Sequence, residues 1–170
     1  MTGAELQFRE FFAAEYGRLR GLGYLLTGDW AQAEELAQDA LVRTFRAWSR
    51  VRQHERPGAY ARKVLVNRHR SLLRRAAVEA RHLAGRRVDE ADGAELTEDG
   101  LVLWAAVRRL PARQRAVLVL RYHEDLPEAE VARLLRLPLG TVKSLAHRGL
   151  ARLRADLGSP AMEELRGKQP

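Results

Sequence analysis

Apolar side chains recur along most of this chain at a spacing of three to four residues, which is the period of an amphipathic helix. No stretch alternates apolar and polar residues as a half-buried strand does. Helices are expected over residues 4–26, over residues 30–49 and over residues 57–75, where a proline occupies the first turn. A turn at residues 27–29 and a polar loop at residues 50–56 separate them. The N-terminal part of the chain therefore predicts three helices.

The apolar positions of the first two helices predict which side chains form the core. Each helix has one apolar face, and Asp29 stands where its carboxylate can cap the second helix. The expected core positions are Phe8, Phe11, Phe12, Tyr16, Leu19 and Leu22 on the first helix and Ala33, Ala37, Ala40, Leu41, Phe45 and Trp48 on the second.

The helical period weakens between residues 76 and 100, where the stretch VDEADGAELTEDG is acidic and poor in large apolar residues. Such a composition is typical of a flexible linker. Four shorter helices are expected after it, over residues 101–110, 111–123, 127–135 and 138–157, followed by a disordered tail at residues 158–170. The pattern predicts an all-α fold of two small helical domains, residues 4–75 and residues 101–157, joined by a flexible acidic linker.

The composition of the 170 residues excludes several classes of function. The chain has no cysteine, so it forms neither disulfides nor thiolate metal sites, which fits a reducing cytoplasm. The N-terminus lacks the order of a signal peptide, and no apolar run approaches the ~18 residues that span a bilayer. The 5 histidines lack the spacing of metal ligands, and no segment matches a nucleotide-binding loop. We therefore expect a soluble, cytoplasmic protein that is not an enzyme and holds neither cofactor nor metal.

The distribution of charge is more informative than the total of +8. Residues 1–75 carry 14 basic and 8 acidic side chains, a net charge of +6, and residues 101–170 carry 13 and 7, again +6. The stretch between them carries 3 basic and 7 acidic side chains, a net charge of −4. Two basic blocks joined by an acidic strip are typical of two nucleic-acid-binding modules and a linker. Solvated helix faces on a basic protein are the alternative.

The segment PEAEVARLLRLPLGTVKSLAHRGLARLR, residues 127–154, has the length and pattern of a helix-turn-helix. On a helical wheel its second helix has one apolar side and one polar side. The first turns of such a helix reach base edges, and its free amides reach phosphate. The candidate DNA-binding residues on this helix are Thr141, Lys143, Ser144, His147, Arg148 and Arg152. An ordinary helical hairpin with a solvated basic face is the alternative.

Two further stripes of charge lie on the N-terminal helices. On the helix at residues 57–75, one stripe is formed by Lys63, Asn67, Arg70 and Arg74. It suits contacts with bases and phosphates, although solvated arginine stripes are common. On the preceding helix Glu35 and Asp39 stand one turn apart. Because carboxylates repel DNA, this acidic face is either exposed to solvent or contacts a protein partner.

Three segments of the chain resemble one known family. Residues 25–48, LLTGDWAQAEELAQDALVRTFRAW, resemble the region 2 helix of extracytoplasmic-function sigma factors of bacterial RNA polymerase. Residues 57–75, PGAYARKVLVNRHRSLLRR, are similar to the adjoining promoter-recognition helix of that family. Residues 110–154, LPARQRAVLVLRYHEDLPEAEVARLLRLPLGTVKSLAHRGLARLR, resemble region 4. The order and spacing of the segments also agree with the family.

The resemblance implies a function and a role for each stripe. It implies a sigma factor that binds core RNA polymerase and promoter DNA, with an anti-sigma factor as a further conceivable partner. Asp39 would contact the clamp helices of the largest polymerase subunit. Asn67, Arg70 and the arginines after them would lie against the minus-ten element, with residues 49–56 near an extruded base. Residues 141–152 would bind the minus-thirty-five element in the major groove.

The chain departs from the family pattern at two positions. The family usually has glycine at the position of Arg136, in the turn between the two helices, and often has arginine at the position of Leu145. If the backbone at the first position is left-handed, an arginine there costs about 1 kcal/mol. A stand-alone helix-turn-helix regulator and a helical adaptor protein are the alternative functions. Either would act without directing polymerase to promoters.

Overall fold

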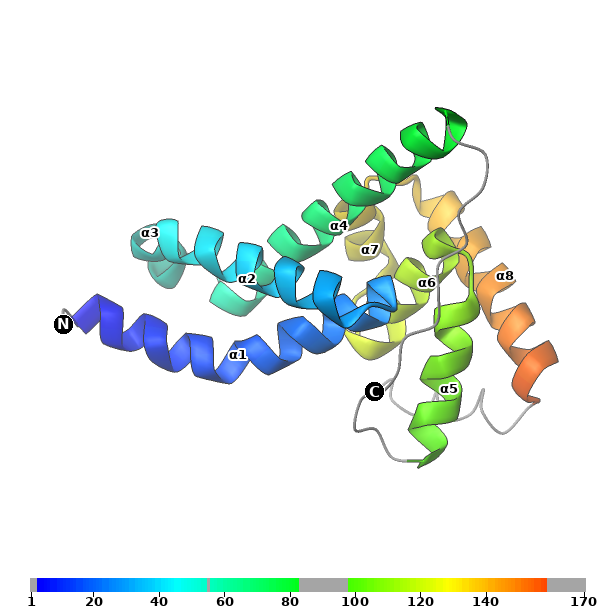
Figure 1. Ribbon diagram of the computed structural model, residues 1–170, viewed down its shortest axis with the longest axis horizontal. Helices are drawn as coiled ribbons and strands as arrows, with labels where there is room; N and C mark the ends of the chain where they lie inside the picture. Colours follow the sequence, from blue (N-terminus) through cyan, green and yellow to red (C-terminus); the bar gives the residue numbers. More distant parts are fainter. Residues whose placement is uncertain (1–2, 55, 83–97, 159–170) are drawn as a thin grey trace. The chain divides into compact units, whose positions relative to one another are not determined.

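The computed structural model describes residues 3–54, 56–82 and 98–158, and within these ranges the chain is helical and has no strand (Figure 1). The helices are α1 (Gly3–Thr27), α2 (Trp30–Arg46), α3 (Trp48–His54), α4 (Pro57–His82), α5 (Glu98–Arg109), α6 (Ala112–Leu118), η1 (Val119–His123), α7 (Glu128–Leu135) and α8 (Leu139–Leu157). The all-α fold class is confirmed. The chain divides into two compact units, residues 1–91 and residues 92–170.

The first unit is a bundle in which α1, α2 and α4 pack on one another and α3 contacts all three (Figure 1). Leu22, Leu36 and Leu65, one from each long helix, are fully buried at its centre. The turn between α1 and α2 is closed by Asp29, whose Oδ1 accepts a hydrogen bond from the backbone N–H of Gln32 at 3.0 Å. The cap predicted for the second helix is therefore confirmed.

Two of the expected core positions in this unit are wrong, and three more, Phe8, Phe11 and Tyr16, are only half-buried. Phe12 is 41% exposed and Phe45 is 50% exposed. Both lie at the edge of the α1–α2 contact, where they meet other aromatic rings: Phe12 stacks on Tyr16 at 5.4 Å between ring centroids, and Phe45 lies 4.8 Å from Phe8. A helical wheel places each of these rings on the apolar side of its helix, but only the middle of that side faces the core.

Because Gly23 has no side chain, the backbone of α1 packs directly against the backbone of α2 at this position. A Cβ atom at this buried glycine would lie 2.9 Å from the Cα of Ala33 and 3.1 Å from its Cβ. Such a contact with backbone is not relieved by rotating a side chain. The α1–α2 pair must therefore separate if residue 23 carries any side chain.

Gly23→Ala is expected to lower the free energy of unfolding by about 1–3 kcal/mol, because it overpacks this contact. Gly17→Ala is the matched control, since a Cβ at Gly17 on the same helix meets nothing within 4 Å. That change should stabilise the protein by about 0.5–1 kcal/mol through helix propensity. Urea unfolding followed by circular dichroism measures both. Equal stability of the two variants would contradict the close approach.

Three helix boundaries differ from the sequence-based expectation. Most of the loop expected at residues 50–56 is helical, because α3 buries Val51 and Trp48 and leaves its arginines outside. Helix α4 continues past Arg75 to His82, and α5 begins at Glu98. The acidic linker expected at residues 76–100 is therefore helical at both ends. Its middle part, residues 83–97, and the tail from residue 159 onward lie outside the described residues.

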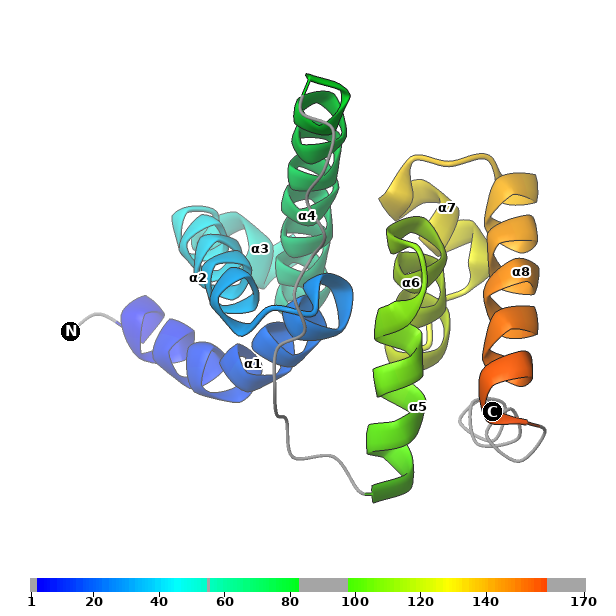
Figure 2. The ribbon, with the colours of Figure 1, turned by 45° about the vertical axis from the view of Figure 1, so that its right-hand side comes forward.

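The second unit places α8 beside α5, α6 and α7 (Figure 2). Its core includes Val107, Leu118 and Leu153, all fully buried. A single helix was expected over residues 111–123. It is α-helical in α6 and then continues as the π-helical turn η1. A π turn accommodates one additional residue. Five consecutive residues, Ala116 to Leu120, are buried where the two segments join.

Candidate nucleic-acid and protein interfaces

Helices α7 and α8 with the turn at residues 136–138 form the predicted helix, turn and helix. Val131, Leu134 and Leu135 of α7 are buried, and the apolar side of α8 is buried as well. In the turn, the backbone N–H of Leu137 donates to the carbonyl of Ala132 at 2.9 Å. The packed apolar sides fix α8 so that its opposite side faces solvent.

The solvent side of α8 carries the residues predicted to bind DNA. Lys143, Ser144, His147, Arg148 and Arg152 are exposed, and Thr141 is half-buried. The Nε of Arg148 donates to the backbone carbonyl of Ser144 at 3.2 Å, which leaves its terminal nitrogens available. The structure thus brings the predicted set together on one exposed helical surface.

The basic stripe predicted on α4 lies on a continuous helix. Lys63 and Arg74 are exposed, whereas Asn67 and Arg70 are half-buried. Residues at intervals of three and four share one side of a helix, so these four side chains form one row along α4. The row spans three helical turns and offers both guanidinium and amide donors.

The two residues of the acidic stripe predicted on α2 differ in their exposure and in their contacts. Glu35 is exposed. Asp39 is half-buried and accepts from the Nε of Arg43, which lies 3.0 Å from both carboxylate oxygens. The Nε of Arg68, on α4, lies 3.9 Å from the same carboxylate. Asp39 therefore links α2 to α4 instead of standing alone on the surface.

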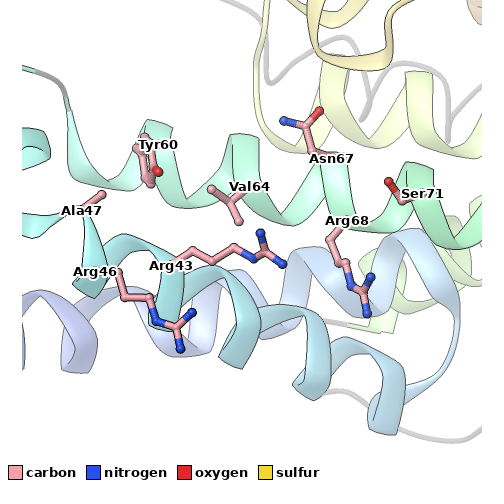
Figure 3. Close-up of a pocket in the computed structure, with 8 residues that line it drawn as sticks. All are labelled: Arg43, Arg46, Ala47, Tyr60, Val64, Asn67, Arg68 and Ser71. Carbon is pink, nitrogen blue, oxygen red and sulfur yellow. The ribbon is translucent and has the colours of Figure 1, made fainter.

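A surface pocket of about 550 Å³ lies between α2 and α4 next to this carboxylate. Three of the eight residues that line it are arginines; the lining residues are Arg43, Arg46, Ala47, Tyr60, Val64, Asn67, Arg68 and Ser71. Figure 3 shows Arg43 and Arg46 extending from α2, and Arg68 pointing from α4 toward α2. Sequence reasoning missed Arg43, Arg46 and Arg68. The four-residue spacing of Asp39 and Arg43 is a helical ion-pair signal that could have revealed the first of them.

Comparison with known proteins places both units of the chain in one family. The model of sigma-70 region 2 matches residues 11–79, and the model of sigma-70, region 4, matches residues 101–153. An RNA polymerase sigma-E factor of Streptomyces avermitilis is 34% identical over 160 residues, which cover 92% of this chain and 88% of that protein. The chain belongs to the sigma-70 family.

Within that family, this sigma factor belongs to the extracytoplasmic-function (ECF) group. The ECF RNA polymerase sigma factor SigL of Mycobacterium tuberculosis is 30% identical over 138 residues, 78% of each chain. The sigma factor RpoE of Bartonella quintana, solved in complex with the anti-sigma factor NepR, has a similar fold, with a TM-score of 0.70 and 21% identity. That likeness covers 88% of this chain and 95% of RpoE. This sigma factor is a transcription initiation factor.

Two negative findings concern the part of the chain that the structure describes. Within it, no three side chains of the histidine, cysteine, aspartate and glutamate types gather as metal ligands would. No helix there combines the length and the apolar character that crossing a bilayer requires.

The two departures from the family pattern have structural consequences in this sigma factor. Leu145 is buried, so a position that often carries arginine in the family supplies packing here. Arg136 has φ 52° and ψ 49°, the left-handed conformation that favours glycine. The turn before α8 therefore carries backbone strain.

Arg136→Gly is expected to raise the free energy of unfolding by about 0.5–1 kcal/mol, because glycine adopts this conformation without steric cost. Arg133→Gly, three residues earlier in α7, should instead lower it by about 1 kcal/mol, as glycine does inside a helix. Thermal unfolding of both variants measures the difference. A destabilised Arg136→Gly variant would show that the arginine side chain makes a stabilising contact that outweighs the strain.

Proposed function

We propose that this sigma factor binds core RNA polymerase and directs it to promoters that carry minus-thirty-five and minus-ten elements, where it assists melting. It acts in the cytoplasm and catalyses no reaction itself. The observation that carries the proposal is the presence of two basic helical surfaces, on α8 and α4, in two separate compact units. Each surface falls within one of the two matched sigma-70 regions.

The surface of α8 is proposed to bind the minus-thirty-five element. An exposed helix of this kind fits the major groove, where arginine pairs with guanine and lysine or serine contacts base edges or phosphate. The residues assigned to this role are Thr141, Lys143, Ser144, His147, Arg148 and Arg152. The unit containing residues 101–157 is thus assigned upstream recognition.

The row along α4 is proposed to bind the minus-ten element. The residues assigned are Lys63, Asn67, Arg70 and Arg74. Basic side chains neutralise phosphates, and the amide of Asn67 can donate to and accept from a base edge. Extruding a base from the duplex costs a few kcal/mol, which binding along this row supplies. The unit containing residues 4–75 is thus assigned minus-ten recognition and melting.

The acidic positions Glu35 and Asp39 on α2 are proposed to contact core polymerase, on a surface where carboxylates exclude DNA. Complementary charge fixes the register of such contacts and raises the rate of association. An anti-sigma factor is the further partner that we propose. Bartonella quintana RpoE was solved with a partner of that class.

Reconstituted transcription tests this function against its alternatives. The purified protein mixed with core polymerase should start transcripts at defined promoters, while the protein alone should bind duplex promoter DNA weakly. A stand-alone helix-turn-helix regulator would protect a specific duplex site without polymerase. An adaptor protein would do neither. Either of these two results would overturn the proposal.

A further inference from the structure

The turn between α7 and α8 holds an arginine whose backbone is strained. Arg136 has φ 52° and ψ 49°, and it stands in the connection that leads into the first turn of α8 (Figure 2). Among the described residues that are not glycine, only Arg136 and Asp125 have a positive φ. Aspartate adopts this conformation more readily than most residues do, because its short polar side chain can hydrogen-bond locally, whereas arginine has no such compensation.

The fold does not explain why this position carries an arginine. Backbone hydrogen bonds hold the turn: the N–H of Leu137 donates to the carbonyl of Ala132 at 2.9 Å, and the N–H of Arg136 donates to the carbonyl of residue 133 at 3.3 Å. The side chain of Arg136 is exposed, and within the described residues it forms no ion pair and no hydrogen bond. Arg133, by contrast, lies 3.6 Å from a carboxylate oxygen of Glu130. Glycine would adopt the same backbone at position 136 without the steric cost.

The place of Arg136 in the fold indicates which ligand its side chain would meet. Strained backbone conformations cluster at binding sites. Pro138, Leu139 and Gly140 are exposed as well, so one open surface joins Arg136 to the residues of α8 that are assigned to the minus-thirty-five element. The first turns of a helix in the major groove reach base edges, so a residue just before them stands near the edge of the groove, where the phosphates of one strand run. A guanidinium group binds a phosphate through two parallel hydrogen bonds.

We infer that Arg136 binds a backbone phosphate of promoter DNA beside the groove that α8 enters, as a positioning residue in addition to those assigned on α8. The inference rests on the proposed function, because it requires α8 to bind DNA. A phosphate contact fixes the register of the protein on the duplex and adds affinity, but it carries no sequence information. A carboxylate of a protein partner is the competing ligand. The continuity of the exposed surface with α8 favours DNA.

Stability and DNA binding should then change in opposite directions when Arg136 is replaced by glycine. The substitution relieves the strained backbone, so the melting temperature should be at or above that of the wild type. It also removes one phosphate contact, so the affinity for promoter DNA should fall. A variant that bound DNA weakly because it was poorly folded would melt at a lower temperature. The pair of measurements therefore distinguishes a lost contact from a damaged turn.

Equilibrium binding of the reconstituted holoenzyme to a fluorescently labelled promoter fragment tests the inference, at a temperature low enough to keep the duplex closed. Arg136→Gly and Arg136→Asn both suit the left-handed backbone. Each should weaken binding about three- to tenfold and reduce the salt slope by about one. Arg136→Lys keeps the charge and should retain most of the affinity. Arg154→Gln is the matched control, since it removes one charge from an exposed position in the last turn of α8, and it should change the affinity less than about twofold.

Three results would overturn the inference. One is equal affinity and equal salt slope of the Arg136→Gly and Arg154→Gln variants, which would show that only the net charge matters. Another is a loss for Arg136→Gly that changes when single base pairs of the minus-thirty-five element are substituted, because a phosphate contact is lost uniformly across sequences. The third is weaker binding of Arg136→Gly to core polymerase in the absence of DNA, which would identify a contact with protein.

Arg148→Ala separates these failures from a failure of the proposed function. If Arg148→Ala weakens promoter binding and Arg136→Gly does not, the inference about Arg136 is rejected and the role of α8 stands. If neither variant weakens binding, the assignment of α8 to the minus-thirty-five element is rejected together with the inference.

Discussion

Asp39→Arg is expected to weaken binding of this sigma factor to core RNA polymerase at least tenfold. Juxtaposed like charges in an interface cost several kcal/mol, more than the loss of one attractive contact. The change also places an arginine beside Arg43 and Arg68, so three cations stand together where Asp39 had paired with two of them. Competition between labelled wild-type protein and the variant for core polymerase measures the affinity.

The fold should survive this substitution. Asp39 retains 30% of its side-chain exposure, and its ion pairs lie at the surface, where such pairs stabilise a protein little. Glu10→Arg, on the exposed side of α1, applies the same charge reversal away from the proposed contact and should leave polymerase affinity close to wild type. An Asp39→Arg protein that competes as well as wild type would remove Asp39 from the polymerase interface.

Arg148→Ala is expected to reduce transcription about five- to 100-fold from promoters that depend on the minus-thirty-five element. A lost contact between arginine and a guanine or phosphate is worth about 1–3 kcal/mol. Arg148 is exposed on α8, and its terminal nitrogens project from a helix that is fixed by buried residues on its other side. Run-off transcription over a series of salt concentrations measures the loss.

Arg154→Ala is the control for that experiment. Arg154 is also exposed on α8 but lies in its last turn, outside the proposed recognition surface. It should alter transcription less than twofold, since a lone surface charge contributes little. Promoters that lack a functional upstream element should be insensitive to both variants. If Arg148→Ala leaves both the transcription level and its salt dependence unchanged, α8 is not the recognition helix.

The sequence correctly predicted the helices whose apolar period is long and uninterrupted. Its predictions failed for helix bounds and side-chain burial that depend on contacts between helices. Helix α1 begins and ends within one residue of its expected bounds because the turn after Leu26 is encoded locally. Helix α3 was missed because, among residues 48–53, whose burial the structure describes, only Trp48 and Val51 are buried and their neighbours are polar. The exposure of Phe45 depends on where α1 crosses α2, which no local pattern specifies.

The same distinction holds for the candidate surfaces. The exposed side of α8 follows from its period, so each predicted residue on it lies on the helix where the wheel placed it. The contact between Asp39 and Arg68 joins residues from two helices and depends on how those helices pack. The pocket between α2 and α4 is therefore a product of the fold, because its lining comes from two helices whose packing no local pattern specifies.

The π turn at Val119–His123 gives the second unit one place where the chain can be shortened at little cost to the rest of the unit. Such a turn holds one residue more than an α-helical turn, so removing one residue there would restore an ordinary α-helix whose flanking turns stay in phase. The contact of α7 with η1 and the hydrogen bond from the backbone N–H of Leu126 to the carbonyl of Leu120, at 3.1 Å, would need only local adjustment. A single-codon deletion inside α8 would instead rotate every later residue of that helix by about 100° about its axis, and the proposed DNA-binding surface would be divided.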